Sequence, residues 1–104
     1  MATERQLRIG ALAIDVAARR VWRDGEELDL RAKEFDLLAA LAGNAGHVVT
    51  RDELMREVWD QHWFGSTKTL DVHMAALRRK LGNARSGPGS ITTLRGVGYR
   101  LERS

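Results

Sequence analysis

The spacing of apolar residues changes along the chain, and each change constrains the fold. Between residues 7 and 30, apolar and polar side chains alternate, which is typical of half-buried β-strands. In three stretches between residues 35 and 81, the apolar residues recur at intervals of three and four, as in helices that bury one face. Two short strand-like segments follow between residues 91 and 101. The order of sheet, three helices and hairpin predicts an α+β fold.

Turn and capping residues divide these regions into elements. Asp24-Gly25 lies between two alternating segments and predicts a hairpin turn, because both turn positions need a positive φ. The first helix is expected to end near Gly43-Asn44. Thr50 and Glu53 have the spacing of a capping box, in which each side chain bonds to the backbone amide of the other residue. A second helix is therefore expected to begin there.

Length and composition exclude several classes of protein. The 104 residues suit a single domain, expected to span 1–104 with an ordered core at about 7–101. The absence of cysteine excludes disulfides and thiolate metal sites. No membrane span and no export signal are recognised, so a cytoplasmic location is expected. No phosphate loop, metal-ligand spacing or activated nucleophile is recognised, so no enzyme activity, cofactor or metal is predicted.

The charges are distributed unevenly along the chain. Residues 1–65 contain nine Lys or Arg and twelve Asp or Glu, a net charge of −3. Residues 66–104 contain eight Lys or Arg and two Asp or Glu, a net charge of +6. A domain with one basic end indicates an anionic partner at that end, although a basic tail that favours solubility gives the same count.

The third predicted helix, over about residues 67–81, has two different faces. On a helical wheel, its large apolar side chains form one narrow stripe assigned to the core: Leu70, Met74, Leu77 and Leu81. The opposite stripe is small and apolar at its centre and cationic near both ends: Lys68, Val72, Ala75, Ala76 and Arg79. Such a surface suits the major groove of DNA, where Val72 can touch a thymine methyl. A solvent-exposed helix that uses alanine for its propensity gives the same pattern, so the wheel leaves both alternatives open.

A second basic element follows this helix. Arg95 stands in a turn with Gly96 and Gly98, between the last two predicted strands. A recognition helix followed by a basic hairpin is the winged form of the helix-turn-helix. An arginine at the hairpin tip suits a narrow minor groove, where the negative potential is greatest. Together with the charge distribution, this favours DNA binding over an incidental arginine in a tight turn.

Several segments resemble the OmpR/PhoB family of response-regulator DNA-binding domains. They are KEFDLL (33–38) in the first helix, TRDEL (50–54) with VW (58–59) in the second, TLDVHM (69–74) with LRRKL (77–81) in the recognition helix, and TTLRGVGYR (92–100) in the wing. The resemblance covers about residues 7–101. The two C-terminal motifs together are highly specific.

The resemblance implies an architecture and a set of partners. It implies a four-stranded N-terminal antiparallel sheet, three helices and a C-terminal β-hairpin wing that pairs with a short strand at Val48-Val49. It also implies an output domain that follows a phosphorylatable receiver, is monomeric alone and dimerises on tandem direct repeats of double-stranded DNA. The loop at residues 59–66 corresponds to a segment through which some relatives contact RNA polymerase.

The resemblance also assigns candidate DNA-binding residues. The positions that match contacts to the phosphate backbone are Trp59, Lys68, His73, Arg78, Thr93 and Tyr99. The groove-facing positions are Val72, Ala76 and Arg79, and Arg95 matches the arginine of the minor groove. Thr69, at the start of the recognition helix, completes the set.

The chain departs from the family pattern at two places. Arg31 stands where the family often has a threonine that caps the first helix, and an arginine cannot accept the amide hydrogen bond of a cap. Asp29 or water is expected to cap this helix instead. Ala75 and Ala76 stand where some relatives have arginine. Fewer base hydrogen bonds are then available, and Val72, Arg79, the wing and DNA shape are expected to carry more of the specificity.

Other residues are given structural interpretations. Asp71 is expected to favour the helix N-terminus or to pair with Arg78, with a cytosine contact as the alternative. Gly96 and Gly98 are expected to serve the turn. Trp22 is expected to pack in the core or on a sheet face.

Two other functions remain open from the sequence. A winged helix can serve as a protein–protein adaptor, although an adaptor does not need both a cationic helix face and Arg95. Antibiotic-pathway activators carry a similar DNA-binding domain at their N-terminus, followed by a different partner domain.

Overall fold

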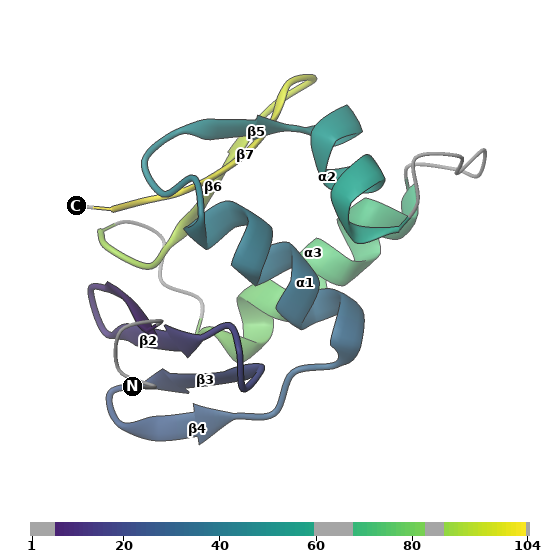
Figure 1. Ribbon diagram of the computed structural model, residues 1–104. Coiled ribbons are helices and arrows are strands. Elements are labelled where there is room, and N and C mark those ends of the chain that lie inside the picture. The colour runs from purple at the N-terminus through teal and green to yellow at the C-terminus, as the bar shows by residue number, and fades with distance from the viewer. Residues whose placement is uncertain (1–5, 60–67, 83–86, 104) are drawn as a thin grey trace.

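The computed structural model describes residues 6–59, 68–82 and 87–103. The N-terminal sheet contains β1 (Gln6–Ile9), β2 (Leu12–Asp15), β3 (Arg20–Arg23) and β4 (Glu26–Leu28). The helices are α1 (Ala32–Ala42), α2 (Arg51–Val58) and α3 (Lys68–Lys80), with β5 (Val48–Thr50) between the first two. The C-terminal hairpin contains β6 (Ile91–Leu94) and β7 (Gly98–Leu101). The helices lie between the N-terminal sheet and the hairpin sheet (Figure 1), which confirms the α+β winged-helix prediction.

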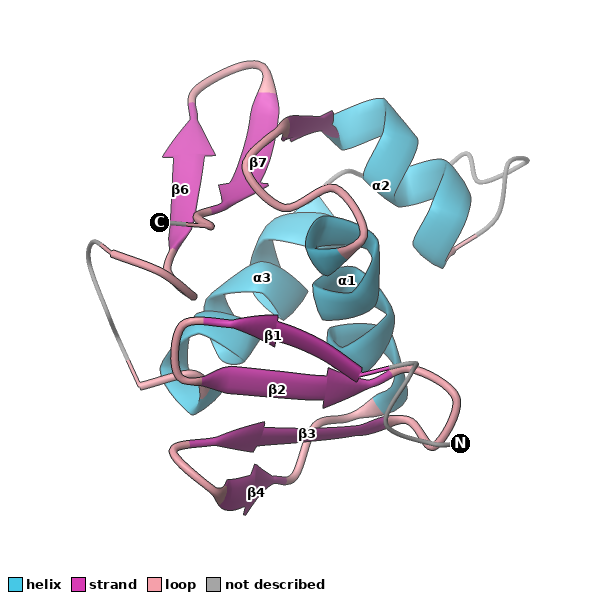
Figure 2. Ribbon diagram, turned by 60° about the vertical axis from the view of Figure 1, so that its left-hand side comes forward, coloured by secondary structure: helices cyan, strands magenta, loops and turns pink. Residues whose placement is uncertain are grey.

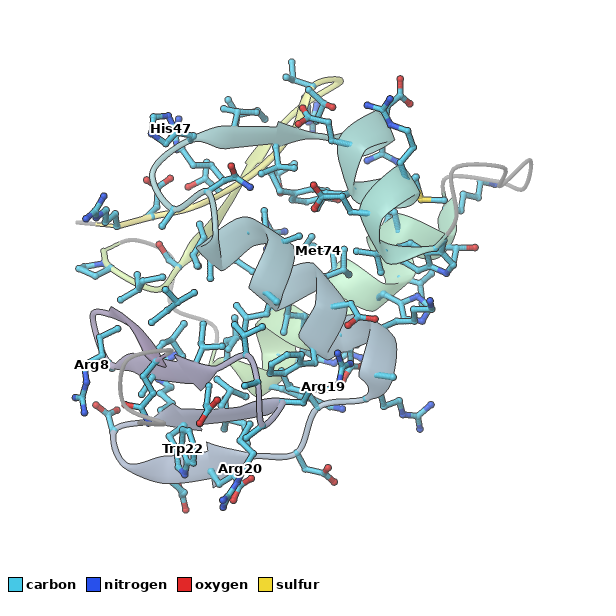
Figure 3. All side chains as sticks on the ribbon, viewed as in Figure 1. Arg8, Arg19, Arg20, Trp22, His47 and Met74 are labelled. Carbon is cyan, nitrogen blue, oxygen red and sulfur yellow. The ribbon has the colours of Figure 1, made fainter. Side chains whose placement is uncertain are left out.

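The N-terminal sheet is antiparallel, with its strands in sequence order. Val21 of β3 pairs with Ile14 of β2, and both side chains are buried against the helices. Asp24 and Gly25 have φ values of 52° and 82°, as a type I′ hairpin turn requires, so the predicted turn is confirmed. Because side chains alternate along a strand, Trp22 lies on the outer face of the sheet (Figure 3).

The second sheet joins the hairpin to the strand that precedes α2. Its order is β5-β7-β6, and Val48 and Val49 belong to β5, as the family resemblance implied. A Cβ on Gly98 would lie 2.0 Å from the carbonyl oxygen of Val49, so no larger residue fits without moving the strand. The expectation that Gly98 serves the turn is therefore wrong, because β5 approaches it closely. Gly96, with a φ of 73°, does serve the turn.

One hydrophobic core connects the helices to both sheets. The predicted core stripe of α3 is buried in full, at Leu70, Met74, Leu77 and Leu81. Met74 of α3 is buried in this core (Figure 3), and Figure 2 shows α1 and α3 packed behind the N-terminal sheet. Leu101 of β7 brings the hairpin sheet into the same core. None of the helices in the described segments is long and apolar enough to cross a membrane.

Helices α1 and α2 begin with the same backbone geometry but with different caps. Thr50 has φ −72° and ψ 159°, and its hydroxyl accepts the Glu53 amide at 3.1 Å, which confirms the capping box. Arg31 has φ −73° and ψ 162°, but its side chain makes no capping bond. The carboxylate of Glu34 accepts the Arg31 amide at 2.9 Å. Within the described residues, Glu34 rather than Asp29 therefore bonds to the start of α1.

Candidate nucleic-acid interface

The outer face of α3 is exposed, as the wheel predicted. Val72 retains 66% of its accessible surface, the largest value among the large apolar side chains that the structure describes. Ala75 and Arg79 are exposed beside it, and Ala76 is half-buried. The face is therefore narrow and apolar at its centre, with Arg79 near one end. These properties suit close contact with a partner that has methyl groups and negative charge.

The wing turn is attached to the start of α2. The turn is closed by a bond from the amide of Val97 to the carbonyl of Leu94 at 2.9 Å. The carbonyl of Val97 in turn accepts the amide of Arg51 at 3.1 Å, which places the hairpin tip beside α2 (Figure 1). Arg95 is exposed in this turn. A fixed backbone therefore presents the predicted minor-groove arginine to solvent.

Arg78 joins the recognition helix to β6. Its Nη2 atom donates to the carbonyl of Ile91 at 2.9 Å and to the hydroxyl of Thr93. Its guanidinium carbon lies 5.4 Å from the ring centroid of Tyr99. The predicted pairing of Arg78 with Asp71 is therefore wrong, because the guanidinium faces the hairpin. The Nε atom of Arg78 is buried and has no hydrogen-bond partner among the described residues.

Asp71 pairs instead with residues from two other elements. Arg51 at the start of α2 donates to both carboxylate oxygens, at 2.8 and 3.1 Å. The hydroxyl of Tyr99 donates to Asp71 at 2.7 Å. The bonds from Arg51, followed by that from Tyr99, outweigh partial burial and lower the pKa of Asp71. The carboxylate is therefore ionised at neutral pH, with a cation beside it.

Tyr99 is directed inward rather than toward solvent. Only 5% of its surface is exposed. Burial, followed by the bond to Asp71, raises the pKa of the phenol. A phenol has one proton to donate, and here that proton goes to Asp71. In this arrangement Tyr99 holds the wing against α3. Its hydroxyl has no proton left to donate to a phosphate of DNA.

A second cluster lies at the other flank of α3, where Trp59 and His73 meet edge to face with ring centroids 5.2 Å apart. The Nδ1 atom of His73 lies 2.8 Å from the carbonyl oxygen of Thr69, which requires a proton on Nδ1. The ammonium of Lys33 lies 5.7 Å from the Trp59 ring centroid and donates to the carbonyl of Val58 at 2.7 Å. The structure thus brings Trp59, Thr69 and His73 together, with Lys33 as an additional cation.

The remaining candidates lie at the start of α3 and in the preceding loop. Lys68 is exposed and Thr69 is half-buried. Apart from Trp59, the segment 59–66 assigned to RNA polymerase lies outside the described residues. The described segments contain no group of three His, Cys, Asp or Glu side chains able to hold a metal ion.

Sequence reasoning missed the roles of Arg51 and Lys33. The sequence places Arg51 only in a helix motif, yet its guanidinium neutralises Asp71, which lies 20 positions away. Lys33 reaches Val58, which lies 25 positions away. Periodicity reports which face a side chain occupies, but contacts between elements depend on how the helices cross. The one available signal in the sequence is Asp71 itself. An acidic residue on a helix expected to face DNA needs a cation close by.

An exposed helix with a cationic end, fixed by Arg78 and Tyr99 to an arginine-bearing hairpin, defines a winged helix-turn-helix domain of the DNA-binding type. Residues 25–101 match the family described as "Transcriptional regulatory protein, C terminal". The chain belongs to this family, the OmpR/PhoB-type DNA-binding domains of response regulators, which regulate transcription. It is a family of transcription-regulator domains and not of enzymes.

Longer regulatory proteins are among its relatives. The chain is 49% identical over 92 residues to the transcriptional regulatory protein VxrB of Vibrio cholerae, covering 88% of this chain and 35% of VxrB. It is 44% identical over 96 residues to the sensory transduction protein RegX3 of Mycolicibacterium smegmatis, covering 92% of this chain and 42% of RegX3. The chain thus spans less than half the length of these curated relatives.

Solved structures of isolated DNA-binding domains share the fold over nearly their whole length. The RstA DNA-binding domain of Klebsiella pneumoniae, in complex with the RstA box, has a TM-score of 0.84 and 32% identity, covering 96% of this chain and 99% of that domain. The DNA-binding domain of CpxR from E. coli has a TM-score of 0.83 and 34% identity, covering 95% of this chain and 98% of that domain.

Proposed function

We propose that this chain binds double-stranded DNA in a sequence-specific manner, with its recognition helix at about 67–81 in the major groove and Arg95 in the adjacent minor groove. The observation that carries this proposal is the exposed apolar face around Val72, which is 66% accessible and ends in Arg79. A valine so exposed on a helix with a well-buried opposite face suits a partner surface. The RstA relative bound to its DNA box supports the same assignment.

The side chains divide into two roles on the duplex. Those assigned to base edges are Val72, Ala76 and Arg79, where Arg79 suits the two acceptors of guanine and Val72 the methyl of thymine. Those assigned to the phosphates are Trp59, Lys68, Thr69, His73, Arg78 and Thr93. Thr93 accepts from Arg78 and so keeps its own proton for a phosphate oxygen. The predicted phosphate contact of Tyr99 requires that its hydroxyl first release Asp71.

We place this domain in a longer regulator on the strength of its relatives. The chain, proposed to be a single domain with its core at about 7–101, acts as the output domain of a two-component response regulator. It is monomeric alone and dimerises on tandem direct repeats, and the segment 59–66 contacts RNA polymerase. Because its ligand is chromosomal DNA, it acts in the cytoplasm.

The two alternative functions are not favoured. The adaptor function leaves the exposed Arg79 and Arg95 without a purpose. The relatives reported above are named as transcriptional regulatory and sensory transduction proteins, which supports the response-regulator function over that of an antibiotic-pathway activator.

Salt dependence of duplex binding is the direct test. Fluorescence anisotropy with a mixed-sequence duplex measures the association constant as the salt concentration rises. We expect a linear fall of log K against log salt with a slope of several units, because each neutralised phosphate contributes about −0.9. A flat response contradicts DNA binding and favours the adaptor.

Sequence specificity needs a separate test. Arg79→Ala is expected to cost about 1–3 kcal/mol of binding free energy and to relax the preference at one base pair, measured by selection from a random duplex pool. Arg8→Ala, at an exposed position on β1, is the control and should leave the selected sequence unchanged. Uniform weakening across all sequences would reassign Arg79 to a phosphate.

A further inference from the structure

We propose that Arg31 binds a DNA backbone phosphate on the side of α3 opposite the wing. This inference rests on the proposed function, because it adds a contact to the same duplex. It concerns a residue at which this chain departs from the family pattern, and it gives that departure a purpose.

The position of Arg31 is the first argument. A groove lies between the start of α1 and the outer face of α3, with Arg31 on one side and Val72, Ala76 and Arg79 on the other. Arg31 is exposed. The chain reaches this point from β4, on the way into α1 (Figure 1). A duplex seated on Val72 and Arg79 therefore passes within reach of the Arg31 side chain.

The charges around this groove are the second argument. Glu34, which also lines it, is only 3% exposed, and the ammonium of Lys80 lies 2.6 Å from its carboxylate. Arg31 donates its backbone amide to Glu34, and the charge of its guanidinium helps to lower the pKa of that carboxyl, but the guanidinium makes no hydrogen bond with a described residue. The side chain of Arg79 likewise has no such partner in the described segments. The groove therefore carries an excess of positive charge that suits a phosphate.

The geometry of the major groove is the third argument. A helix in this groove has one phosphate backbone on each side. On one side of α3, Arg78 and Thr93 lie toward the wing. On the other side, His73 and Arg31 both line the groove that the protein forms between α1 and α3. Arg31 extends the basic surface toward the second backbone, and the planar fork of a guanidinium matches two phosphate oxygens.

The local cost of Arg31 is the fourth argument. A cation at the start of a helix opposes the helix dipole, and an arginine cannot accept the amide that Thr50 accepts at α2. Because Arg31 and Thr50 share the same φ and ψ, a threonine at position 31 would complete a capping box with Glu34. Residues that break a local rule are expected at functional sites. The poor cap therefore supports a function for this side chain.

The substitution Arg31→Thr separates binding from stability, because the two effects have opposite signs. Affinity for a mixed-sequence duplex is measured by anisotropy over a range of salt concentrations, and Tm is measured without DNA. The matched control is Arg8→Thr, which removes the same charge from an exposed site on β1 in the N-terminal sheet (Figure 3). A second variant, Arg31→Lys, keeps the positive charge but loses the planar guanidinium that can bind two phosphate oxygens.

We expect Arg31→Thr to weaken binding roughly 5- to 10-fold near 0.1 M salt and to reduce the salt slope by about 0.9, the value for one phosphate contact. Its Tm is expected to rise by several degrees because the cap improves. Arg31→Lys should keep the salt slope with a smaller loss of affinity. Arg8→Thr should change neither the slope nor the affinity appreciably.

Two results would overturn the proposal while leaving duplex binding by the unmodified chain intact. One is a salt slope for Arg31→Thr equal to that of Arg8→Thr, which would mean that Arg31 faces solvent or another partner. The other is a fall in Tm for Arg31→Thr, which would mean that the arginine stabilises α1 and needs no DNA to explain it. A flat salt response of the unmodified chain would instead remove the proposed function itself.

Discussion

The hydroxyl of Tyr99 donates to the carboxylate of Asp71 across 2.7 Å, and this bond joins the wing to the recognition helix. Arg51 binds the same carboxylate from the start of α2. Three elements that are distant in the sequence therefore meet at one ionised group. A hairpin and helix held at a fixed angle before binding lose less freedom on a duplex, which favours affinity.

Tyr99→Phe tests this role. It removes the hydroxyl and leaves the buried ring in place, so we expect the free energy of unfolding to fall by about 1.5–3 kcal/mol, as for a hydrogen bond to a charged acceptor. The pKa of Asp71 should rise, because the bond from Tyr99 contributes to lowering it. Urea denaturation measures the first effect, and NMR titration of the Asp71 carboxyl measures the second.

The control for this prediction is a double-mutant cycle with Asp71→Asn. The effect of Tyr99→Phe on stability should shrink in that background, because the acceptor has changed. Unchanged stability with weakened DNA binding would mean that the hydroxyl contacts a phosphate rather than Asp71.

The local features of this fold were predictable, and the long-range ones were not. The Asp24-Gly25 turn and the buried stripe through Met74 follow from signals confined to a few residues, which one sequence displays in full. The partner of Asp71 did not follow, because Arg51 lies on another helix and any nearby cation satisfies the same chemistry. Arg78 lies two helical turns after Asp71 and is the cation that the sequence pattern pairs with it, yet the crossing of α3 and the hairpin directs Arg78 to Ile91.

Gly98 shows that long-range contacts of the backbone are equally hard to predict from a local sequence pattern. Its neighbours Arg95 and Gly96 make a turn evident, so the sequence pattern assigns Gly98 to that turn as well. Its actual constraint comes from the carbonyl of Val49, which lies 49 positions earlier in the chain and would be 2.0 Å from a Cβ. The pairing register of β5 with β7 creates this contact, and no local pattern specifies that register.

Gly98→Ala should therefore be strongly destabilising. The added Cβ displaces β5 from β7, and we expect a loss of about 3 kcal/mol in the free energy of unfolding, typical of severe overpacking. Gly96→Ala is the matched control, because its Cβ would have no neighbour within 4 Å. It should cost about 1 kcal/mol from its positive φ alone. Urea denaturation of both variants measures the difference, and equal losses would contradict the close-approach argument.

The stability of the chain should depend on pH through Glu34. Burial raises the pKa of Glu34, but the bonds from Lys80 and from the Arg31 amide outweigh burial and hold it below the ordinary value of 4.5. A carboxyl with a lowered pKa in the folded state stabilises the fold above its unfolded pKa. This stabilisation is lost as the pH falls through the lower pKa of the folded state.

Glu34→Gln measures that contribution. At pH 7 it should lower the free energy of unfolding by about 2 kcal/mol, because Lys80 loses its charged partner. The gap between this variant and the unmodified chain should narrow as the pH falls below about 4. Glu27→Gln breaks an exposed ion pair with Arg20 and is the control, with a smaller effect at every pH. A gap that stays constant into acid would show that the carboxyl does not titrate as described.

Arg95 should distinguish duplexes by the sequence beside the recognition site rather than within it. A guanidinium gains most in a narrow A·T minor groove, where the potential is most negative. Arg95→Ala should therefore weaken binding more on a duplex with A·T pairs under the wing than on one with G·C pairs there, with the major-groove site held constant. Arg95→Lys should recover part of the loss, because it keeps the charge but is more strongly hydrated. Anisotropy on the two duplexes gives the comparison, and an equal loss on both would place Arg95 on a phosphate.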